Sequence, residues 1–231
     1  MVQCSPTYFT NVMVNAIKPE FHTPKDVKKI AEKQLNLDDV GPLAAVVVGF
    51  LGTSYLDLTD LSKLRCADLI NEQNTIKDSF VHPISRKVVV IPNGWFTDLL
   101  LQYIEWCKIK NIGQQNLDIY LGRNPNSFFL LRANGEEFVL SPKSKKANNC
   151  IMQPQALTRF VKKLNLPLGM TPRSLNKGYL INIADQQFRY GNNLTAIVNL
   201  EAVTQLHRTT IIRLTKRSPE TIEQSVKSLF S

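Results

Sequence analysis

Nine consecutive residues, 43–51, limit the folds open to this chain more than any other stretch. They follow Pro42 and are all apolar apart from a single glycine. Proline fits the first turn of a helix, and a helix that is apolar on every side is buried in the middle of a domain. The run is too short to cross a bilayer, for which about 20 apolar residues are needed. The sequence therefore predicts a domain folded around a central helix.

A second helix is predicted to begin at Pro172, with Thr171 as its N-cap. Its apolar residues recur every three or four positions and form one stripe: Leu175, Tyr179, Leu180, Ile183 and Ala184. The first turn and a half carries Arg173, Asn176 and Lys177 on the opposite side from that stripe. A helix N-terminus adds partial positive charge, so this end suits an anion and above all a phosphate.

The remaining patterns predict a mixed α+β fold that is mostly α-helical, with a small antiparallel sheet packed on a helical bundle. Further helices are expected at residues 24–35, 95–109, 153–164, 194–206 and 211–214. Residues 56–69 read as a short helix followed by a turn into a strand. Strands are expected at 74–77 and 87–91, which would pair as a hairpin, and at 128–131 and 137–140 around an Asn134-Gly135 turn. We expect residues 1–21 to be an arm or extension and residues 22–231 to be one domain.

Composition excludes several classes of site. The four cysteines are scattered, with no CxxC pair and no histidine at ligand spacing, so we expect structural thiols and neither metal nor cofactor. No P-loop, nucleophile elbow or glycine-rich phosphate loop occurs. The chain shows no secretory leader, and no membrane partner is expected. We expect a protein of the cytoplasm or nucleoid in a prokaryote, or of the nucleus in a eukaryote.

Positive charge is concentrated in the last part of the chain. Residues 141–231 hold 14 Lys and Arg against 4 Asp and Glu, whereas residues 1–140 hold 14 against 15. A one-sided excess of this kind is typical of nucleic-acid binding, because each neutralised phosphate releases counterions. The candidate DNA-binding residues are Arg173, Asn176, Lys177, Lys143, Lys145, Lys146, Arg159, Lys162, Lys163, Arg208, Arg213 and Lys216. A solvated basic face without a partner is the alternative interpretation.

Three stretches together resemble the catalytic domain of the tyrosine recombinase and phage integrase family. The first is Leu61-x-x-Leu64-Arg65-x-x-Asp68-Leu69 with the hairpin strand that ends at Pro92. The second is residues 128–131, the Asn-Gly turn and the helix from Gln153. The third is Met170-Thr171-Pro172-x-x-Leu175 with the helix that follows. The resemblance covers residues 22 to about 190 and implies a catalytic-type domain without the family's separate DNA-clamping domain.

The family's catalytic residues do not carry over onto this sequence. In register with the first motif, the family's arginine falls on Asp57, and its His-x-x-Arg falls on Arg173-x-x-Asn176. The family's hairpin lysine would fall near Val81 or His82, and no lysine lies there. No tyrosine follows Tyr190, and the position of the nucleophile falls on Arg213 or Lys216. Cleavage of a phosphodiester needs cationic donors and a nucleophile, so the resemblance implies a chain that has lost this activity.

Three functions therefore remain open. The first is a DNA-binding protein without recombinase catalysis, acting on double-stranded DNA as an accessory, architectural or regulatory factor of a mobile element or plasmid. The second is a diverged strand-transferase or relaxase-like enzyme that uses Tyr179 or Tyr190. The third is a protein-interaction subunit without DNA binding. Residues 218–230 resemble the family's last helix, and they predict a homo-oligomer held through Ile222, Val226, Leu229 and Phe230.

Overall fold

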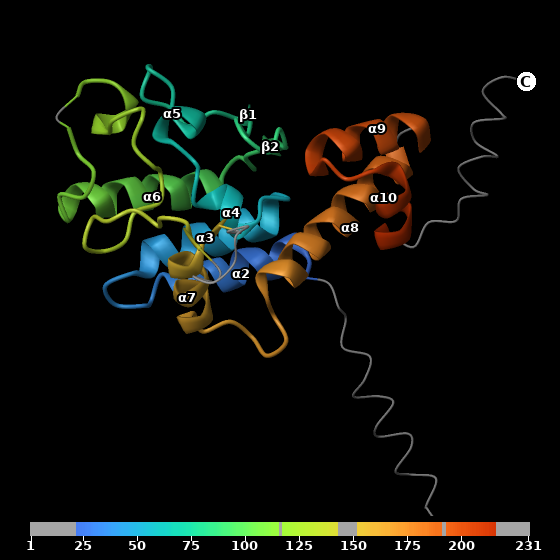
Figure 1. The fold of residues 1–231 in the computed structure, drawn as a ribbon, viewed down its shortest axis with the longest axis horizontal. Coiled ribbons are helices and arrows are strands. Elements are labelled where there is room, and N and C mark those ends of the chain that lie inside the picture. The colour runs from blue at the N-terminus through green and yellow to red at the C-terminus, as the bar shows by residue number, and fades with distance from the viewer. Residues whose placement is uncertain (1–21, 116, 143–151, 191–192, 216–231) are drawn as a thin grey trace, which may run out of the picture.

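A computed structural model describes residues 22–115, 117–142, 152–190 and 193–215 of the chain. Helix α3, Gly41–Thr53, lies at its centre, and the apolar residues 43–51 are all buried. Helices α2 (Pro24–Gln34), α6 (Trp95–Ile109) and α8 (Pro172–Tyr190) pack around it (Figure 1). The prediction of a buried central helix is confirmed, as is the mostly helical α+β fold.

Local sequence signals set the ends of the major helices. Thr23 caps α2 in a reciprocal capping box, in which Thr23 N donates to the Asp26 carboxylate at 3.0 Å and Asp26 N donates to Thr23 Oγ1 at 3.3 Å. Helix α8 begins at Pro172 as predicted, with Ser174 N donating to Thr171 Oγ1 at 3.1 Å. These caps satisfy backbone donors that the first turn of a helix leaves unpaired.

The first predicted strand was wrong in position. The hairpin pairs β1, Ser79–Val81, with β2, Val88–Val90, in antiparallel register. Residues 74–77 instead form a turn and a single bridge between Ile76 and Ile70. Asn74 adopts a positive φ of 61° there, which interrupts a strand. The one-turn helices α4 (Leu58–Leu61) and α5 (Cys66–Leu69) follow α3, so the predicted strand at the end of this region is also absent.

Residues 128–131 and 137–140 do not form the predicted strands. They make only isolated bridges, Arg65 with Phe128 and Leu131 with Glu137. The carbonyls of Phe128 and Phe129 are taken by the buried guanidinium of Arg123, at 3.2 and 2.9 Å, instead of a neighbouring strand. A second short ladder joins β3 (Ser141–Pro142) to β4 (Met152–Gln153), and the 3₁₀ turn η1 spans Tyr120–Gly122.

The C-terminal described helices form a smaller unit around the far half of α8. Helix α9 spans Asn193–Thr204 and α10 spans Arg208–Thr215, whereas α7, Gln155–Lys163, packs into the main core through Leu157 and Val161. Helices α9 and α10 pack on α8 at the end of the molecule away from α6 (Figure 1). Their contact buries Leu180, Ala184, Leu200 and Ile211. None of the helices in the described ranges is long and apolar enough to cross a membrane.

Candidate nucleic-acid interface

A pocket of about 500 Å³ lies where three separate parts of the chain meet. The segment from Tyr55 to the start of α4 forms one wall, Lys87 at the edge of the hairpin forms another, and the first turns of α7 and α8 close the third. Asp57, Arg173 and Asn176 all line it, although Asp57 is more than 100 residues away from the other two in sequence. The fold therefore brings together the positions that the sequence motifs had singled out.

Asp57 has a structural task in this pocket. Its Oδ1 accepts hydrogen bonds from the backbone N–H groups of Thr59 and Asp60 at 2.8 and 2.9 Å, so it is the N-cap of α4. The Asp60 carboxylate accepts in return from Asp57 N at 3.1 Å. The two acids form a capping box, which stabilises a helix of only one turn.

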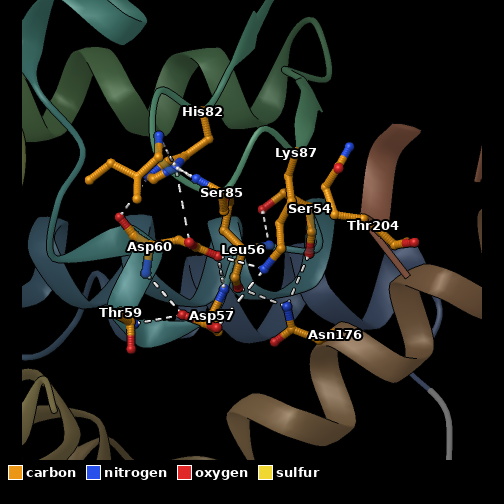
Figure 2. A network of polar contacts seen from close by, with 12 residues as sticks. Ser54, Leu56, Asp57, Thr59, Asp60, His82, Ser85, Lys87, Asn176 and Thr204 are labelled. Carbon is orange, nitrogen blue, oxygen red and sulfur yellow. Dashed lines mark hydrogen bonds and ion pairs between the residues drawn. The ribbon is translucent and has the colours of Figure 1, made fainter. Parts of the chain in front are cut away.

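Lys87 brings a cation to the same pocket and is neutralised there. Its Nζ lies 2.6 Å from Asp60 Oδ2 and 3.9 Å from Asp57 Oδ2 (Figure 2). The side chains of Lys87 and Asp60 are only 13% and 9% exposed, so water screens their attraction weakly. A phosphate entering beside Lys87 would meet two carboxylates, and the local charge does not favour it.

His82 supports the same network from the hairpin turn. It is fully buried, and its Nδ1 accepts the backbone N–H of Ser85 at 3.1 Å. Since a backbone N–H can only donate, the ring proton sits on Nε2, which donates to the carbonyl of Asp60 at 3.1 Å. Both ring nitrogens are therefore used. The sequence did not indicate this buried structural role of His82.

Asn176 holds α8 to the connection between α3 and α4. Its Nδ2 donates to the carbonyl of Leu56 at 2.7 Å and to that of Ser54 at 3.4 Å (Figure 2). Only the amide oxygen, an acceptor, is left for a ligand. An acceptor does not attract a phosphate, so the geometry favours a positioning role for this predicted DNA-binding residue.

Arg173 remains exposed in the first turn of α8. It lines the pocket described above and also an adjoining pocket of about 500 Å³, which Lys177 and Leu214 line as well. Tyr55 lies between the two. Burial raises the pKa of Tyr55, and the nearby Arg173 guanidinium partly offsets this shift. The sequence offered no signal for Tyr55, because its place depends on how α8 packs on the α3–α4 connection.

Comparisons with known proteins agree with this arrangement at the level of the fold. No family model matches the chain, and no curated protein matches it significantly. The crystal structure of XerA recombinase matches with a TM-score of 0.52 at 13% identity, over 93% of this chain and 67% of the other. The fold is that of a tyrosine recombinase catalytic domain. At this identity the likeness shows the fold alone, and it confirms the fold that the sequence motifs predicted.

A second solved structure, the Tn1549 transposon integrase with transposon right-end DNA, matches at a TM-score of 0.46. It is 13% identical and aligns over 91% of this chain and 66% of its own length. The chain thus spans about two thirds of the length of these recombinases and integrases.

The other predicted DNA-binding residues of this recombinase-like fold fall in several places. Arg159, Lys162 and Lys163 are exposed on α7, and Arg159 and Lys163 line a separate pocket of about 320 Å³ with Phe160. On α10, Arg213 is exposed, and Arg208 lies 3.6 Å from the Glu201 carboxylate. Lys143, Lys145, Lys146, Lys216 and the segment 218–230 lie outside the described residues.

Two tyrosines were considered as nucleophiles, and the structure describes the side chain of one of them, Tyr179. Tyr179 lines a different groove, with Val90 and Leu200, and not the pocket of Arg173. Burial raises the pKa of Tyr179 to about 12, which disfavours the phenolate that a nucleophile needs. The side chain of Tyr190 lies outside the described set. Within the described residues, no cluster of His, Cys, Asp or Glu could hold a metal ion.

Proposed function

We propose that this chain is a DNA-binding protein with a tyrosine-recombinase-like fold that does not cleave DNA. The observation that carries the proposal is the ion-pair network of Asp57, Asp60 and Lys87. A strand-cleaving site needs its cations directed at the scissile phosphate. Here the resemblance assigns the first catalytic arginine to Asp57, and the cation nearest to it is held by two carboxylates.

Two features support DNA binding: the positive charge of the last part of the chain and the exposed Arg173 in the first turn of α8. Arg173 is exposed at the first turn of this helix, and Lys177 lines the adjoining pocket one turn later. Lys162 is exposed on α7, whose Thr158 lines the same pocket as Arg173. Contacts of this kind grip phosphates and position a protein without reading sequence. The basic half of the chain, residues 141–231, adds a long-range attraction for the duplex.

The biological role that fits is an accessory, architectural or regulatory factor of a mobile element or plasmid. In this role residues 22–231 act as one domain on double-stranded DNA, in the cytoplasm or nucleoid of a prokaryote or the nucleus of a eukaryote. The segment 218–230 would then join copies of the chain. A chain truncated before Ser218 is expected to sediment as a smaller species than the intact chain. An unchanged sedimentation mass would remove this self-association from the proposal.

The binding test titrates the protein into a fluorescent duplex of about 30 base pairs and follows anisotropy at two salt concentrations. We expect binding that weakens steeply with salt, and weaker binding for Arg173→Ala and Lys162→Ala. Lys108→Ala is the matched control, because Lys108 is half exposed on α6, outside the basic half. Absence of binding at low salt would sink the DNA proposal and favour a protein-interaction subunit.

The cleavage test incubates the protein with nicked suicide duplexes and looks for a covalent protein–DNA adduct. We expect none. An adduct that disappears in Tyr55→Phe, Tyr179→Phe or Tyr190→Phe would establish the alternative of a diverged enzyme and identify its nucleophile. Because the binding assay is run on the same duplex, a lack of adduct is separated from a lack of binding.

A further inference from the structure

A groove of about 490 Å³ runs along the far half of α8 and carries no charge. It lies between α8 and α9 on one side and the start of α2, the end of α3 and β2 on the other. Its apolar lining includes Val90, Tyr179, Ile183, Leu200 and Val203, and its polar lining consists mainly of side-chain amides. None of the described residues that line it is ionisable at neutral pH. We refer to it as the uncharged groove.

Such a surface is unusual on this molecule and unsuited to DNA. The chain has a net charge of +9, yet this groove offers no cation to a phosphate. Exposed apolar patches mark places where another apolar surface binds. An apolar cavity of about 150 Å³ accommodates benzene, so the uncharged groove has room for several apolar side chains. Its occupant should be a largely neutral, apolar peptide.

Residues 22–24, the first that the structure describes, lie at the edge of this groove. Pro24 lines it, and the carbonyl of His22 accepts a hydrogen bond from Asn182 Nδ2 at 3.0 Å. The His22 backbone also lies directly over Gly178, where an added Cβ would stand 3.0 Å from it. These contacts fix residue 22 against α8, so residues 1–21 are attached beside the groove.

The sequence of residues 1–21 is largely neutral and contains many apolar residues, as expected of an occupant of the groove. Five of its apolar residues recur at intervals of three and four, the spacing of one face of a helix: Phe9, Val12, Met13, Ala16 and Ile17. The only ionisable side chains of opposite sign, Lys18 and Glu20, cancel each other. Four residues lie between Ile17 and His22, and an extended chain covers up to about 17 Å over these five steps. The stripe can therefore reach the groove without moving His22.

We propose that residues 9–17 bind in the uncharged groove of their own chain, with the apolar stripe against Val90, Ile183 and Val203. The arm then covers an apolar surface that the described helices leave open, and it ties α8 and α9 to the hairpin. This inference is independent of DNA binding, because it uses neither Arg173 nor the basic residues of α7.

The test places a photo-crosslinking amino acid at Val90 in the full chain and maps the adducts by mass spectrometry. Val90 is 53% exposed, so the change is tolerated, and Val198 on α9, 51% exposed and outside the groove, is the matched control. We expect adducts to residues 1–21 from Val90 but not from Val198. Mixing ordinary and heavy-isotope chains should give adducts only within one isotopic species.

Two arm variants make the test specific to the stripe. Val12→Asp places a charge in the stripe and should lower the yield from Val90 at least about tenfold, whereas Val14→Asp lies off the stripe and should leave it unchanged. Equal losses in both variants, or no arm adduct from Val90, would overturn the proposal. Adducts of mixed isotope, or adducts to residues 216–231, would overturn it as well, because a second copy or the C-terminal segment would then fill the groove.

Discussion

The two halves of α8 border surfaces of opposite character. Its first turn faces a pocket of ionic groups, in which Lys87 pairs with Asp60 and Asp57 and Arg173 is exposed. Its later turns face the uncharged groove, lined by Tyr179 and Ile183. The same helix thus carries the proposed phosphate-binding turn and lines the uncharged groove. The two proposals therefore use opposite ends of α8, DNA contacts at its first turn and contacts within the chain at its later turns.

The largest expected effect comes from removing the buried cation of the ionic pocket. Lys87→Met leaves the Asp60 carboxylate, 9% exposed, without its partner, and should lower the free energy of unfolding by about 3 kcal/mol. Lys110→Met is the control, because Lys110 pairs with Asp39 at the surface and should cost less than about 1 kcal/mol. Urea unfolding measures both. Equal effects would show that the pocket pair is no more buried in solution than a surface pair.

Asn176→Ala should lower the free energy of unfolding by about 2 kcal/mol, because the carbonyls of Leu56 and Ser54 lose their donor. The salt dependence of DNA binding should stay the same at temperatures where the variant is folded. Anisotropy titrations alongside thermal unfolding separate the two effects. A stable variant with a shallower salt dependence would instead make Asn176 a phosphate ligand.

The free energy of unfolding should change at alkaline pH because of Tyr179, which lines the uncharged groove. Its pKa is about 12 in the folded chain and 10.0 for the unperturbed group, so both states are protonated below pH 10. Between pH 10 and 12 the unfolded chain loses this proton first, and stability falls as pH rises. At pH 11 the loss should be about 1.4 kcal/mol.

The comparison with Tyr179→Phe isolates that contribution, because every other titrating group is shared. The difference in unfolding free energy between the two chains should be constant up to pH 10 and should then move in favour of the variant. A difference that stays constant up to pH 11 would mean that the phenol is accessible to water in the folded chain.

The smallest expected effect lies at the exposed edge of the groove. Gln187 accepts a hydrogen bond from Asn199 Nδ2 at 3.1 Å on the surface. Gln187→Ala should change the unfolding free energy by less than about 0.5 kcal/mol and leave DNA affinity unaltered. Weaker DNA binding in this variant would extend the DNA contact beyond the charged end of α8.

Sequence patterns predicted those parts of the fold in which local signals are strong. The apolar run of α3, the capped proline at the start of α8 and the periodicity of α6 gave helices that the structure confirms. The hairpin was displaced, because β1 has three residues and Asn74 turns the chain before it. Short strands are set by their partners, and their partners are not visible in a local pattern.

The candidate site was less predictable than the fold. Spacing along α8 placed Arg173 and Asn176 on the polar side, but it could not show that the Asn176 donors are used by Ser54 and Leu56. The sequence did not indicate the role of Lys87, because its ion pair with Asp60 joins residues 27 positions apart and depends on the hairpin register. Contacts of this kind follow from packing, which the sequence encodes only through the whole fold.

The most direct test of DNA binding at the charged end of α8 is the slope of log affinity against log salt for a duplex. The intact chain and the double variant Arg173→Ala Lys177→Ala are compared under the same conditions. If both side chains contact phosphates, the variant slope should be shallower by about 2, since each lost contact removes about one unit. An identical slope in the two chains would contradict the account and place the DNA elsewhere on the molecule.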